Sequence, residues 1–534
     1  MTLTAELNDR PELARRRSGS LRGNLLLAAP FLALFYVQLV HHNLWRDELN
    51  AFAITWASPT LHSLFWHIHR EGHPWLWYVI LWLLSRFTVS LAAFKLLQGC
   101  IGSSIILLIA LRSPFRRWEK ALILASYFFS FEYTVLARMY GILVVLLLLY
   151  CWERTMRPAR PIVSAVLLGL MASADVVGMI LSAALLLEYA WAALAQSRTS
   201  PLFSRAKAAL ALLVYAAITL FAVWSARPAP DVSWRTTGRP LVYAHSFSHL
   251  YGAFLRYTSE AFFSVKSPRS GYFWNPQLGS GGPAYSILML VVLAALYLSL
   301  RRHRNLILLV AVTIVAGTAF SHLVYLGSIR HYGITFLAFL TALWILRGAM
   351  PSKLFPAAAY LLLALSVVSG AWAAIAAWRH PFSNAKVAAD WIRANNLNSL
   401  PLVGQWDTSV IGVAEHLHRP IYMIECRCQD TYLLFSSRRD DYTDDEAPQR
   451  ILGAEDFYHG QPLLFVDAEP LPSSEQSAME SLGLHVQPLA AFSGAEEILE
   501  NFYLYRITRD AAGSSSSITF IERRMREAHE RSAR

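Results

Sequence analysis

Two adjacent carboxylates, Asp47 and Glu48, are the first residues in the chain whose type and position suggest chemistry. They follow the first long apolar run, residues 25–40, and so are expected at a membrane surface. A carboxylate in this position can accept the proton of an acceptor hydroxyl during group transfer. Ionisable residues near a membrane are functional hypotheses by default. The alternative is a solvated acidic pair beside a helix end.

A histidine stands in an unusual turn a little further along the chain. His73 lies in the stretch 70–78, between Gly72 and Pro74, which together predict a sharp entry into an apolar helix. At a membrane interface its ring can donate a hydrogen bond to a phosphate or a sugar. The alternative is an interfacial anchor, with the neighbouring aromatic residues forming a belt.

Two arginines, each two positions before a tyrosine, complete the set of candidate residues. Arg138 follows Glu132, and Arg330 is followed directly by His331. The planar guanidinium fork of arginine can bind two phosphate oxygens, so these residues suit a phosphate or diphosphate group. The alternatives are a structural salt bridge between Glu132 and Arg138, and a topogenic charge at Arg330.

The sequence predicts that membrane-spanning helices position these residues. Of the 534 residues, 55% are hydrophobic and 16% are charged. Runs near the ~20 residues needed to cross hydrocarbon recur along the chain. This predicts a polytopic α-helical membrane protein with about eleven transmembrane helices. The expected spans are 25–40, 93–111, 119–135, 138–153, 161–174, 177–196, 208–225, 284–300, 305–321, 332–347 and 354–378.

The distribution of basic residues predicts the orientation of these helices. The basic residues behind the net charge of +11 cluster in every second short loop and so on one side, a bias typical of cytoplasmic loops rather than of a nucleic-acid partner. Residues 1–23 are therefore expected in the cytoplasm and Asp47 outside, with the first run retained as an anchor. The apolar piece 74–84 is too short to span and is interpreted as re-entrant, because a full span would place the next basic loops outside. Segments 42–92 and 226–283 become outer loops.

The chain changes character after residue 379. Residues 380–511 alternate strand and helix signals and predict a small α/β domain on the outer side, followed by a mobile tail, 512–534. Strands are expected at 401–404, 420–424, 463–466 and 502–507, and a helix at 407–417. Cys426 and Cys428 are interpreted as a strained disulfide or as two free thiols, because no further Cys/His set completes a zinc site.

Known nucleotide-binding and hydrolytic motifs are absent from the sequence. There is no Walker motif, no dinucleotide glycine motif in context, no His-Glu-x-x-His and no Gly-x-Ser-x-Gly. A soluble nucleotide-sugar donor is therefore poorly supported, whereas a donor carried by a lipid suits a membrane scaffold with polar residues at one surface.

These motifs resemble those of GT-C glycosyltransferases. The resemblance comprises Asp-Glu after the first helix, Gly-His-Pro-Trp-Leu-Trp-Tyr, an acid followed by Ala-Arg-x-Tyr, and Arg-His-Tyr-Gly. It is strongest over 24–153 and extends more loosely through the Arg-His-Tyr turn and the outer C-terminal domain. The resemblance implies a GT-C-like transmembrane domain at 24–379. The nearest branch is the bacterial dolichyl-phosphate-mannose-protein mannosyltransferase-like set, related to the lipid A aminoarabinose transferase. Two positions depart from the pattern: Glu132 stands where many relatives have Asp, and His73 where relatives often have Pro or a small residue.

The resemblance implies an inverting transfer from a polyprenyl-phosphate sugar to a lipid, glycan or protein acceptor. The expected catalytic residues are Asp47 as general base, Glu48 in support and Glu132. The expected donor-phosphate ligands are Arg138, Arg330, His331 and His73. The expected substrate contacts are Tyr140, Tyr332 and Trp45. No metal ligands are assigned and no cofactor is certain, although a divalent metal ion is possible because relatives differ in this respect.

The resemblance also implies a multi-pass protein of the bacterial inner membrane with its C-terminal domain in the periplasm. The main rival is a polytopic transporter or lipid-handling protein without glycosyl transfer, for which inverted repeats or broken midplane helices would be expected. A third reading is a non-catalytic assembly subunit whose outer domain is a binding module.

Overall fold

The computed structural model describes most of the chain. The described residues are 20–155, 160–197, 205–232, 246–264, 283–325, 327–350, 353–440, 442–443, 445–497 and 499–509. Residues 1–19 of the expected basic N-terminus, parts of the outer loop 226–283 and the expected tail 512–534 lie outside them. The chain divides into two compact units, unit 1 (Met1–His42, Ser58–Pro230, Trp234–His380) and unit 2 (Asn43–Ala57, Asp231–Ser233, Pro381–Arg534).

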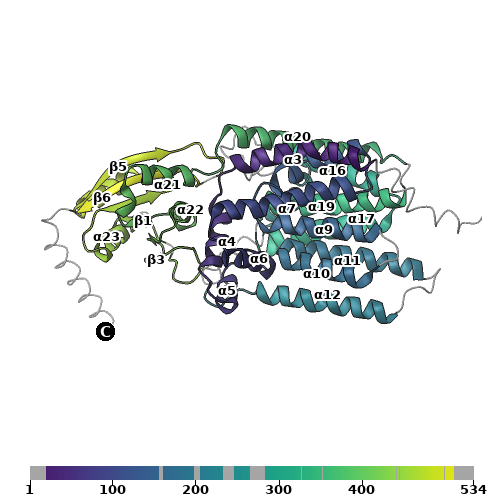
Figure 1. Cartoon of the computed structure of the whole chain (residues 1–534), viewed down its shortest axis with the longest axis horizontal. Helices are drawn as coiled ribbons and strands as arrows, with labels where there is room; N and C mark the ends of the chain where they lie inside the picture. The colour runs from purple at the N-terminus through teal and green to yellow at the C-terminus, as the bar shows by residue number, and fades with distance from the viewer. Residues whose placement is uncertain are drawn as a thin grey trace, which may run out of the picture. The chain divides into compact units, whose positions relative to one another are not determined.

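Unit 1 is a bundle of helices, many of which run side by side (Figure 1). In order along the chain, its α-helices are α3 (Leu21–His41), α5 (Leu61–Ile68), α6 (Trp75–Ser85), α7 (Leu91–Arg112), α8 (Arg117–Ala125), α9 (Met139–Thr155), α10 (Pro161–Ala174), α11 (Val176–Ser197), α12 (Arg205–Ser225), α15 (Phe247–Leu255), α16 (Pro283–Leu300), α17 (Arg304–Leu323), α18 (Ile329–Tyr332), α19 (Ile334–Ala349) and α20 (Ala357–Arg379). Two π-helical turns, η1 (Phe128–Glu132) and η2 (Arg256–Glu260), interrupt them.

The described helices of unit 1 include six that are long and apolar enough to cross a membrane. They are Leu21–His41, Leu91–Arg112, Ala206–Ser225, Arg304–Leu323, Ile329–Ala349 and Ala357–Arg379. Four shorter apolar helices accompany them, at Trp75–Ser85, Pro161–Ala174, Val176–Ala192 and Ala284–Leu300. The protein is thus an integral membrane protein, and the predicted polytopic α-helical architecture is confirmed.

One predicted span is interrupted. The expected helix 119–135 ends as α8 at Ala125, because Ser126 adopts an extended conformation, with φ −68° and ψ 153°. The hydroxyl of Ser126 donates to the carbonyl of Ile123, which completes the end of the helix. The chain then forms η1 and carries Glu132 into the interior. π-Helical turns are frequent at functional sites.

Unit 2 is an α/β sandwich around a six-stranded sheet with the order β3-β2-β1-β4-β6-β5. Its strands are β1 (Leu402–Gly404), β2 (Ile421–Met423), β3 (Cys428–Asp430), β4 (Leu463–Asp467), β5 (Leu484–Phe492) and β6 (Phe502–Arg509). Strands β2, β1 and β4 are parallel neighbours, and the other pairs are antiparallel. The predicted C-terminal α/β domain is therefore confirmed.

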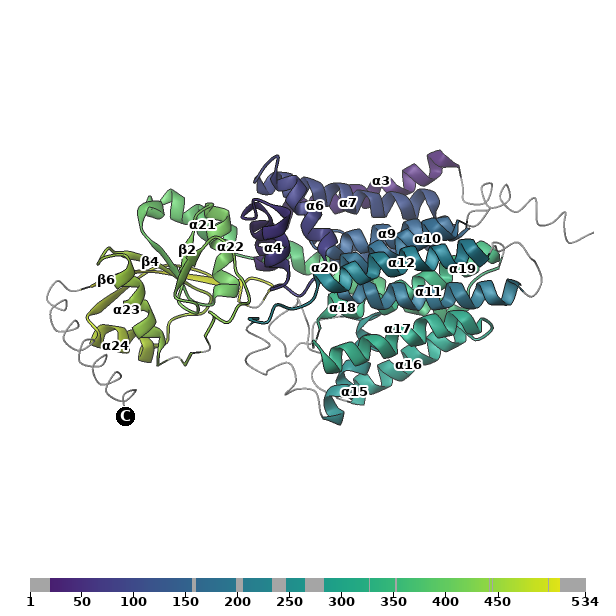
Figure 2. The same cartoon turned by 90° about the horizontal axis from the view of Figure 1, so that it is seen from below.

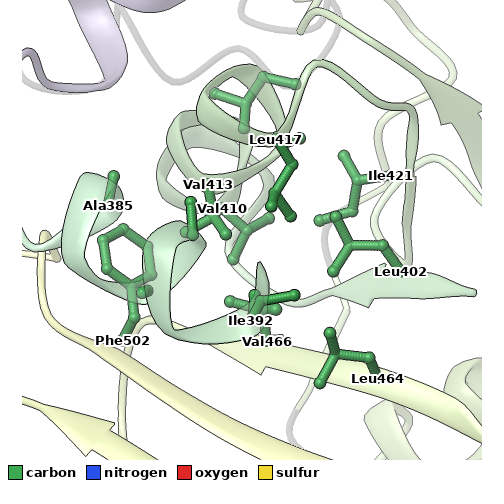
Figure 3. Close-up of a cluster of buried hydrophobic side chains, with 14 of the residues drawn as sticks. Ala385, Ile392, Leu402, Val410, Val413, Leu417, Ile421, Leu464, Val466 and Phe502 are labelled. Atoms are coloured by element: carbon green, nitrogen blue, oxygen red, sulfur yellow. The ribbon is translucent and has the colours of Figure 1, made fainter. Parts of the chain in front are cut away.

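Helices cover both faces of this sheet. The helices of the unit are α4 (Arg46–Trp56), α21 (Ala385–Ala394), η3 (Leu397–Ser399), α22 (Asp407–Leu417), α23 (Ala447–Phe457) and α24 (Ser473–Ser481). On one face Leu402 and Val466 pack with Val410 of α22 (Figure 3). On the other face Val403 packs with Ile451 of α23. This alternation along β1 is the period of two expected for a strand buried on both sides.

A segment from the N-terminal region belongs to this unit. Helix α4 packs on α22 (Figure 2). Cβ of an alanine at Gly412 would lie 3.7 Å from Leu49, so the two helices approach closely there. The amide of Asn50 donates to the carbonyl of Leu433, and the Leu433 amide returns a hydrogen bond to the Asn50 side chain. These contacts bury most of α4.

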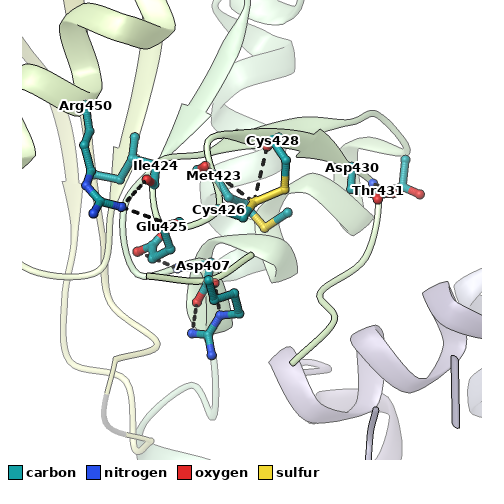
Figure 4. The surroundings of a disulfide bond; sticks show 10 residues. Asp407, Met423, Ile424, Glu425, Cys426, Cys428, Asp430, Thr431 and Arg450 are labelled. Carbon is teal, nitrogen blue, oxygen red and sulfur yellow. Dashed lines mark hydrogen bonds and ion pairs between the residues drawn. A yellow bond between two sulfur atoms is a disulfide. The ribbon is translucent and has the colours of Figure 1, made fainter. Parts of the chain in front are cut away.

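Cys426 and Cys428 form a disulfide where β2 turns into β3 (Figure 4). The other two cysteines, Cys100 and Cys151, are free. Disulfides persist in oxidising compartments and are rare in the cytosol. The bond therefore suits a domain outside the cytoplasm.

Replacing Glu415 by Gln should make unit 2 more stable at alkaline pH. Glu415 is buried in α22, where the Trp56 indole donates to it at 3.4 Å. Burial raises the pKa of Glu415 to about 8, against an opposing effect of the Trp56 hydrogen bond. The unfolded chain loses this proton at lower pH, so the free energy of unfolding falls as the pH rises from about 5 towards that value. The substitution should recover ~2–4 kcal/mol at about pH 8.5 and almost nothing at about pH 5.

Thermal unfolding of the full-length protein in detergent at the two pH values measures this effect. The control is Glu480→Gln, which removes an exposed carboxylate from α24. Equal stabilisation of both variants, or a Glu415→Gln effect independent of pH, would contradict the buried-charge explanation.

Candidate functional site

Asp47 lies in the first turn of α4, in unit 2. The backbone amide of Trp45 donates to the carboxylate of Glu48 at 3.0 Å, which closes the start of the helix. Glu48 is fully buried, and the Trp45 indole is buried against Phe382, with ring centroids 5.6 Å apart. Glu48 and Trp45 therefore position the start of α4, whereas the Asp47 side chain keeps 26% of its surface exposed.

Arg46 fixes the same turn of α4 to the C-terminal part of the chain. Its guanidinium lies 3.1 Å from Glu497 and 3.9 Å from Glu500, and it donates to the hydroxyl of Ser409 at 3.3 Å. The Arg46 amide also donates to Glu500 at 3.3 Å. Burial raises the pKa of Glu500 to about 7, although Arg46 and the hydroxyl of Ser383 both lower it. The helix turn that carries Asp47 is thus fixed by ion pairs and hydrogen bonds of its neighbour Arg46.

In unit 1, Glu132 is the acidic centre of a second group of polar residues. It ends η1, is 1% exposed, and accepts a hydrogen bond from the Tyr127 phenol at 2.8 Å. Arg330 and Arg138 are the cations that act on its charge. The carboxylate of Glu132 is thus bound by the Tyr127 phenol and lies in the electrostatic field of both arginines.

Arg330 is held in this group through its backbone. The Tyr133 phenol donates to the carbonyl of Arg330 at 2.7 Å. A Cβ at Gly333 would lie 2.2 Å from that phenol oxygen and 2.3 Å from the ring of Phe128. Residue 333 must therefore be glycine for η1 and α18 to approach so closely.

His331 uses both ring nitrogens inside the protein. The Ser328 amide donates to Nδ1 at 2.8 Å, and Nε2 lies 3.1 Å from the Tyr140 hydroxyl. Accepting at Nδ1 assigns the proton to Nε2, which donates to Tyr140. His331 is thereby placed to orient Tyr140 more than to meet a ligand. Tyr332, the third residue of this turn, packs edge-on against Tyr257 at 5.1 Å.

His73 lies beside a further acidic residue, Asp175. Its Nδ1 is 3.4 Å from Oδ2 of Asp175, an ion-pair distance without the alignment of a good hydrogen bond. Asp175 separates α10 from α11 and is 1% exposed. Burial opposes its ionisation, but His73, His331 and the Val177 amide outweigh burial and lower the pKa of Asp175. Asp175 is thus a buried anion that can hold the ring of His73.

Glu260 is a further buried acid in the same unit. It ends η2 and is 2% exposed, and burial raises its pKa to about 8 despite the nearby Arg256. Neither Glu260 nor Asp175 belongs to a recognisable sequence motif, and Glu260 stands in an ordinary polar stretch. A signal was present in Asp175 as a lone acid between two apolar runs.

Metal ligands do not gather in the described part of the chain. No group of three or more His, Cys, Asp or Glu side chains there could hold a metal ion. Asp47 and Glu48 lie in unit 2, and Glu132, Arg138, Arg330, His331, His73, Tyr140 and Tyr332 lie in unit 1. The candidate base and the candidate phosphate ligands are therefore each organised within their own unit.

Comparison with known proteins finds similarity to solved structures. No protein-family model and no curated protein matches the chain. Over most of its length the chain is similar to ArnT. The crystal structure of ArnT from Cupriavidus metallidurans bound to undecaprenyl phosphate gives a TM-score of 0.48 at 14% identity, over 91% of this chain and 98% of that one. Its apo state gives 0.42 at 15% identity, over 90% and 97%.

ArnT is a lipid A aminoarabinose transferase, the enzyme to which the predicted branch is related. At this identity and TM-score the similarity assigns neither a substrate nor a residue role to this chain.

Replacing Gly333 by Ala should disturb the polar group of unit 1. The added Cβ would overlap the Tyr133 phenol and the Phe128 ring, so one of them must move and the bond from Tyr133 to the Arg330 carbonyl should break. Overpacking of this kind costs about 1–3 kcal/mol. Thermal unfolding of the full-length protein in detergent measures the loss.

Gly252→Ala is the matched control. It lies in α15, in the same unit, and its new Cβ would meet nothing within 4 Å. Helix propensity predicts that it is neutral or stabilising by up to about 1 kcal/mol. If Gly333→Ala were as well tolerated as Gly252→Ala, the close approach of η1 and α18 would be wrong.

Proposed function

We propose that the chain is an integral membrane glycosyltransferase that moves a sugar from a polyprenyl-phosphate donor to an acceptor hydroxyl, with Asp47 as general base. The observation that carries this proposal is the group of Arg330 and Arg138 around the buried Glu132 in a helical membrane unit. Two arginines in such a place suit the phosphate of a membrane-borne donor, because a guanidinium fork can bind two phosphate oxygens.

The reaction needs one base and stabilisation of one leaving anion. Asp47 takes the proton of the acceptor hydroxyl as that oxygen attacks the anomeric carbon. The bond from the anomeric carbon to the phosphate oxygen breaks, and the electron pair leaves with the polyprenyl phosphate. Attack opposite to the leaving group inverts the configuration. Arg138 and Arg330 lower the energy of the departing phosphate, so a strong general acid is not required.

The remaining residues position these groups. Glu48 and Arg46 fix the turn that carries Asp47. Asp175 holds His73, whose ring can then donate to a donor phosphate or sugar. The network from Ser328 through His331 to Tyr140 fixes that phenol for contact with substrate. A divalent metal ion as an additional requirement stays a prediction.

We further propose that the chemistry occurs at the outer face of a bacterial inner membrane. The Cys426–Cys428 disulfide suits an oxidising compartment for unit 2, which also carries Asp47. The positive-inside bias of the loops independently assigns the N-terminus to the cytoplasm. A cysteine introduced at position 47, where the native side chain is 26% exposed, that is labelled from the cytoplasm would overturn this orientation.

Asp47→Asn should abolish transfer while leaving the protein folded. The amide keeps the shape of the side chain but cannot take a proton, and loss of a general base typically costs about 10²–10⁴-fold in rate. Release of polyprenyl phosphate from polyprenyl-phosphate sugars measures turnover. The control Asp390→Asn removes an exposed carboxylate of unit 2 and should retain full activity. Full turnover by Asp47→Asn would exclude the proposed base, and no wild-type turnover with any donor would favour the transporter reading.

Arg330→Gln should weaken donor binding. Charge-assisted hydrogen bonds contribute about 1.5–3 kcal/mol, so the affinity for polyprenyl phosphate should fall about tenfold or more. Binding of polyprenyl phosphate to the purified protein is measured directly, without turnover. Arg302→Gln, an exposed residue between α16 and α17, is the control and should bind as the wild type does. Equal affinities of the two variants would remove Arg330 from the phosphate site.

A further inference from the structure

The sheet of unit 2 has a topological switch point between β1 and β4. From β1 the chain crosses through α22 to β2 on one side, and it then returns through α23 to β4 on the other side of β1. In open sheets with parallel strands, ligands bind beyond the carboxyl ends of the strands at such a point. The residues that follow these strands are therefore candidates for a binding site.

Polar side chains gather at this edge. Gln405, Trp406 and Asp407 follow β1, Glu425 comes two residues after β2, and Asp467 ends β4. Trp406 has a left-handed backbone, with φ 63° and ψ 63°, and its side chain is 40% exposed. A bulky residue with positive φ is a genuine outlier, and such outliers cluster at functional sites.

Two buried oxygens at this edge have no hydrogen-bond partner among the described residues. They are Oε1 of Gln405 and Oε2 of Glu425, on side chains that are 6% and 8% exposed. The other carboxylate oxygen of Glu425 accepts from the amides of Trp406 and Asp407, at 2.7 and 3.2 Å. Since a buried oxygen without a donor costs about 1–3 kcal/mol, both oxygens are suited to accept from a ligand.

The arginines of this edge are already engaged. Arg439 donates to both oxygens of Asp407, and Arg450 donates to the carbonyls of Ile424 and Glu425, each at 3.1 Å (Figure 4). Burial and the charge of Asp407 raise the pKa of Glu425 to about 7. The edge therefore offers hydrogen-bond acceptors beside buried acids, which favours a ligand rich in O–H or N–H donors and disfavours an anion.

This edge is connected to the candidate base within the same unit. Ser409, in the first turn of α22, accepts a hydrogen bond from Arg46, the residue before Asp47. Glu500, which precedes β6, accepts from the Arg46 amide. Since β6 runs antiparallel to β4, its start lies at the same edge where β4 ends. The turn of α4 that carries Asp47 is thus attached to the carboxyl edge of the sheet.

We propose that the switch-point edge of unit 2, formed by Gln405, Trp406 and Glu425, binds a neutral or amino saccharide that is part of the acceptor. This assignment rests on the proposed glycosyl transfer. The exposed indole offers a flat apolar face for a sugar ring, and the two buried oxygens accept from its hydroxyl or amino groups. Asp47, in the same unit, is then available to deprotonate an acceptor hydroxyl.

Saturation-transfer NMR on the full-length protein tests the site directly. The probes are cellobiose, maltose and the glucosamine disaccharide, with glucose 1-phosphate as an anionic comparison. The wild type should give saturation transfer to at least one of the three disaccharides and less to the phosphate. Trp406→Ala and Gln405→Met should each reduce the disaccharide signal about fivefold or more. Gln405→Met keeps the length of the side chain and removes its oxygen.

Phe457→Ala is the matched control in the same unit. Phe457 is 51% exposed and ends α23, which leads into β4 and so finishes at the opposite edge of the sheet. This variant should bind as the wild type does. Failure of all three disaccharides to bind the wild type, or equal losses in Trp406→Ala and Phe457→Ala, would overturn the site.

Polyprenyl phosphate binding separates this inference from the proposed function. If the wild type binds polyprenyl phosphate and turns over a donor but binds no disaccharide, the saccharide site is wrong and the transferase stands. If Trp406-dependent saccharide binding is present but no donor is turned over, the saccharide site stands and the transferase proposal fails.

Discussion

The ion pairs of Arg46 with Glu497 and Glu500 are the constraint on which the arrangement of the candidate base depends. They join a helix that follows the first apolar run to a loop more than four hundred positions later in the sequence, at a separation of 451 residues in one case. The three side chains are largely buried, so the loss of one partner would leave the others as uncompensated charges. Helix α4 is thereby part of the C-terminal fold.

The two acids of the Asp47-Glu48 pair have different structural roles on this turn. Glu48 points into the protein and closes the first turn of its helix, whereas Asp47 stays partly exposed on the same turn. In unit 1 the same division recurs: Asp175 is buried beside His73, and the His331 ring is used to orient Tyr140. In both units, buried groups hold Asp47 and His73, which stay partly exposed, in fixed positions, and this is the preorganisation that transfer chemistry requires.

Patterns of nearby residues predicted many of the helices and strands. Features that depend on tertiary contacts could not be predicted from the sequence. The helix predicted at 407–417 has the bounds of α22, although its N-cap is Trp406, and the strand predicted at 463–466 lies within β4, because both depend on nearby residues. The membrane helices followed from apolar length. By contrast, the break at Ser126 and the attachment of Asn50 to Leu433, 383 residues apart, depend on tertiary contacts. The role of Asp175 in holding His73 likewise depends on a tertiary contact, because the two residues are far apart in the sequence.

The conformation of Trp406 is difficult to explain by stability alone. A left-handed backbone costs a non-glycine residue about 1–2 kcal/mol, and glycine or asparagine would adopt it more easily. The amide of Trp406 donates to Glu425, but any residue except proline would supply that hydrogen bond. The indole itself is 40% exposed, so its burial offsets only part of the cost. What a tryptophan adds here is an aromatic face at the end of β1, beside two buried oxygens that have no donor among the described residues. Such an arrangement is destabilising in the empty protein and becomes favourable when a ligand supplies the missing hydrogen bonds.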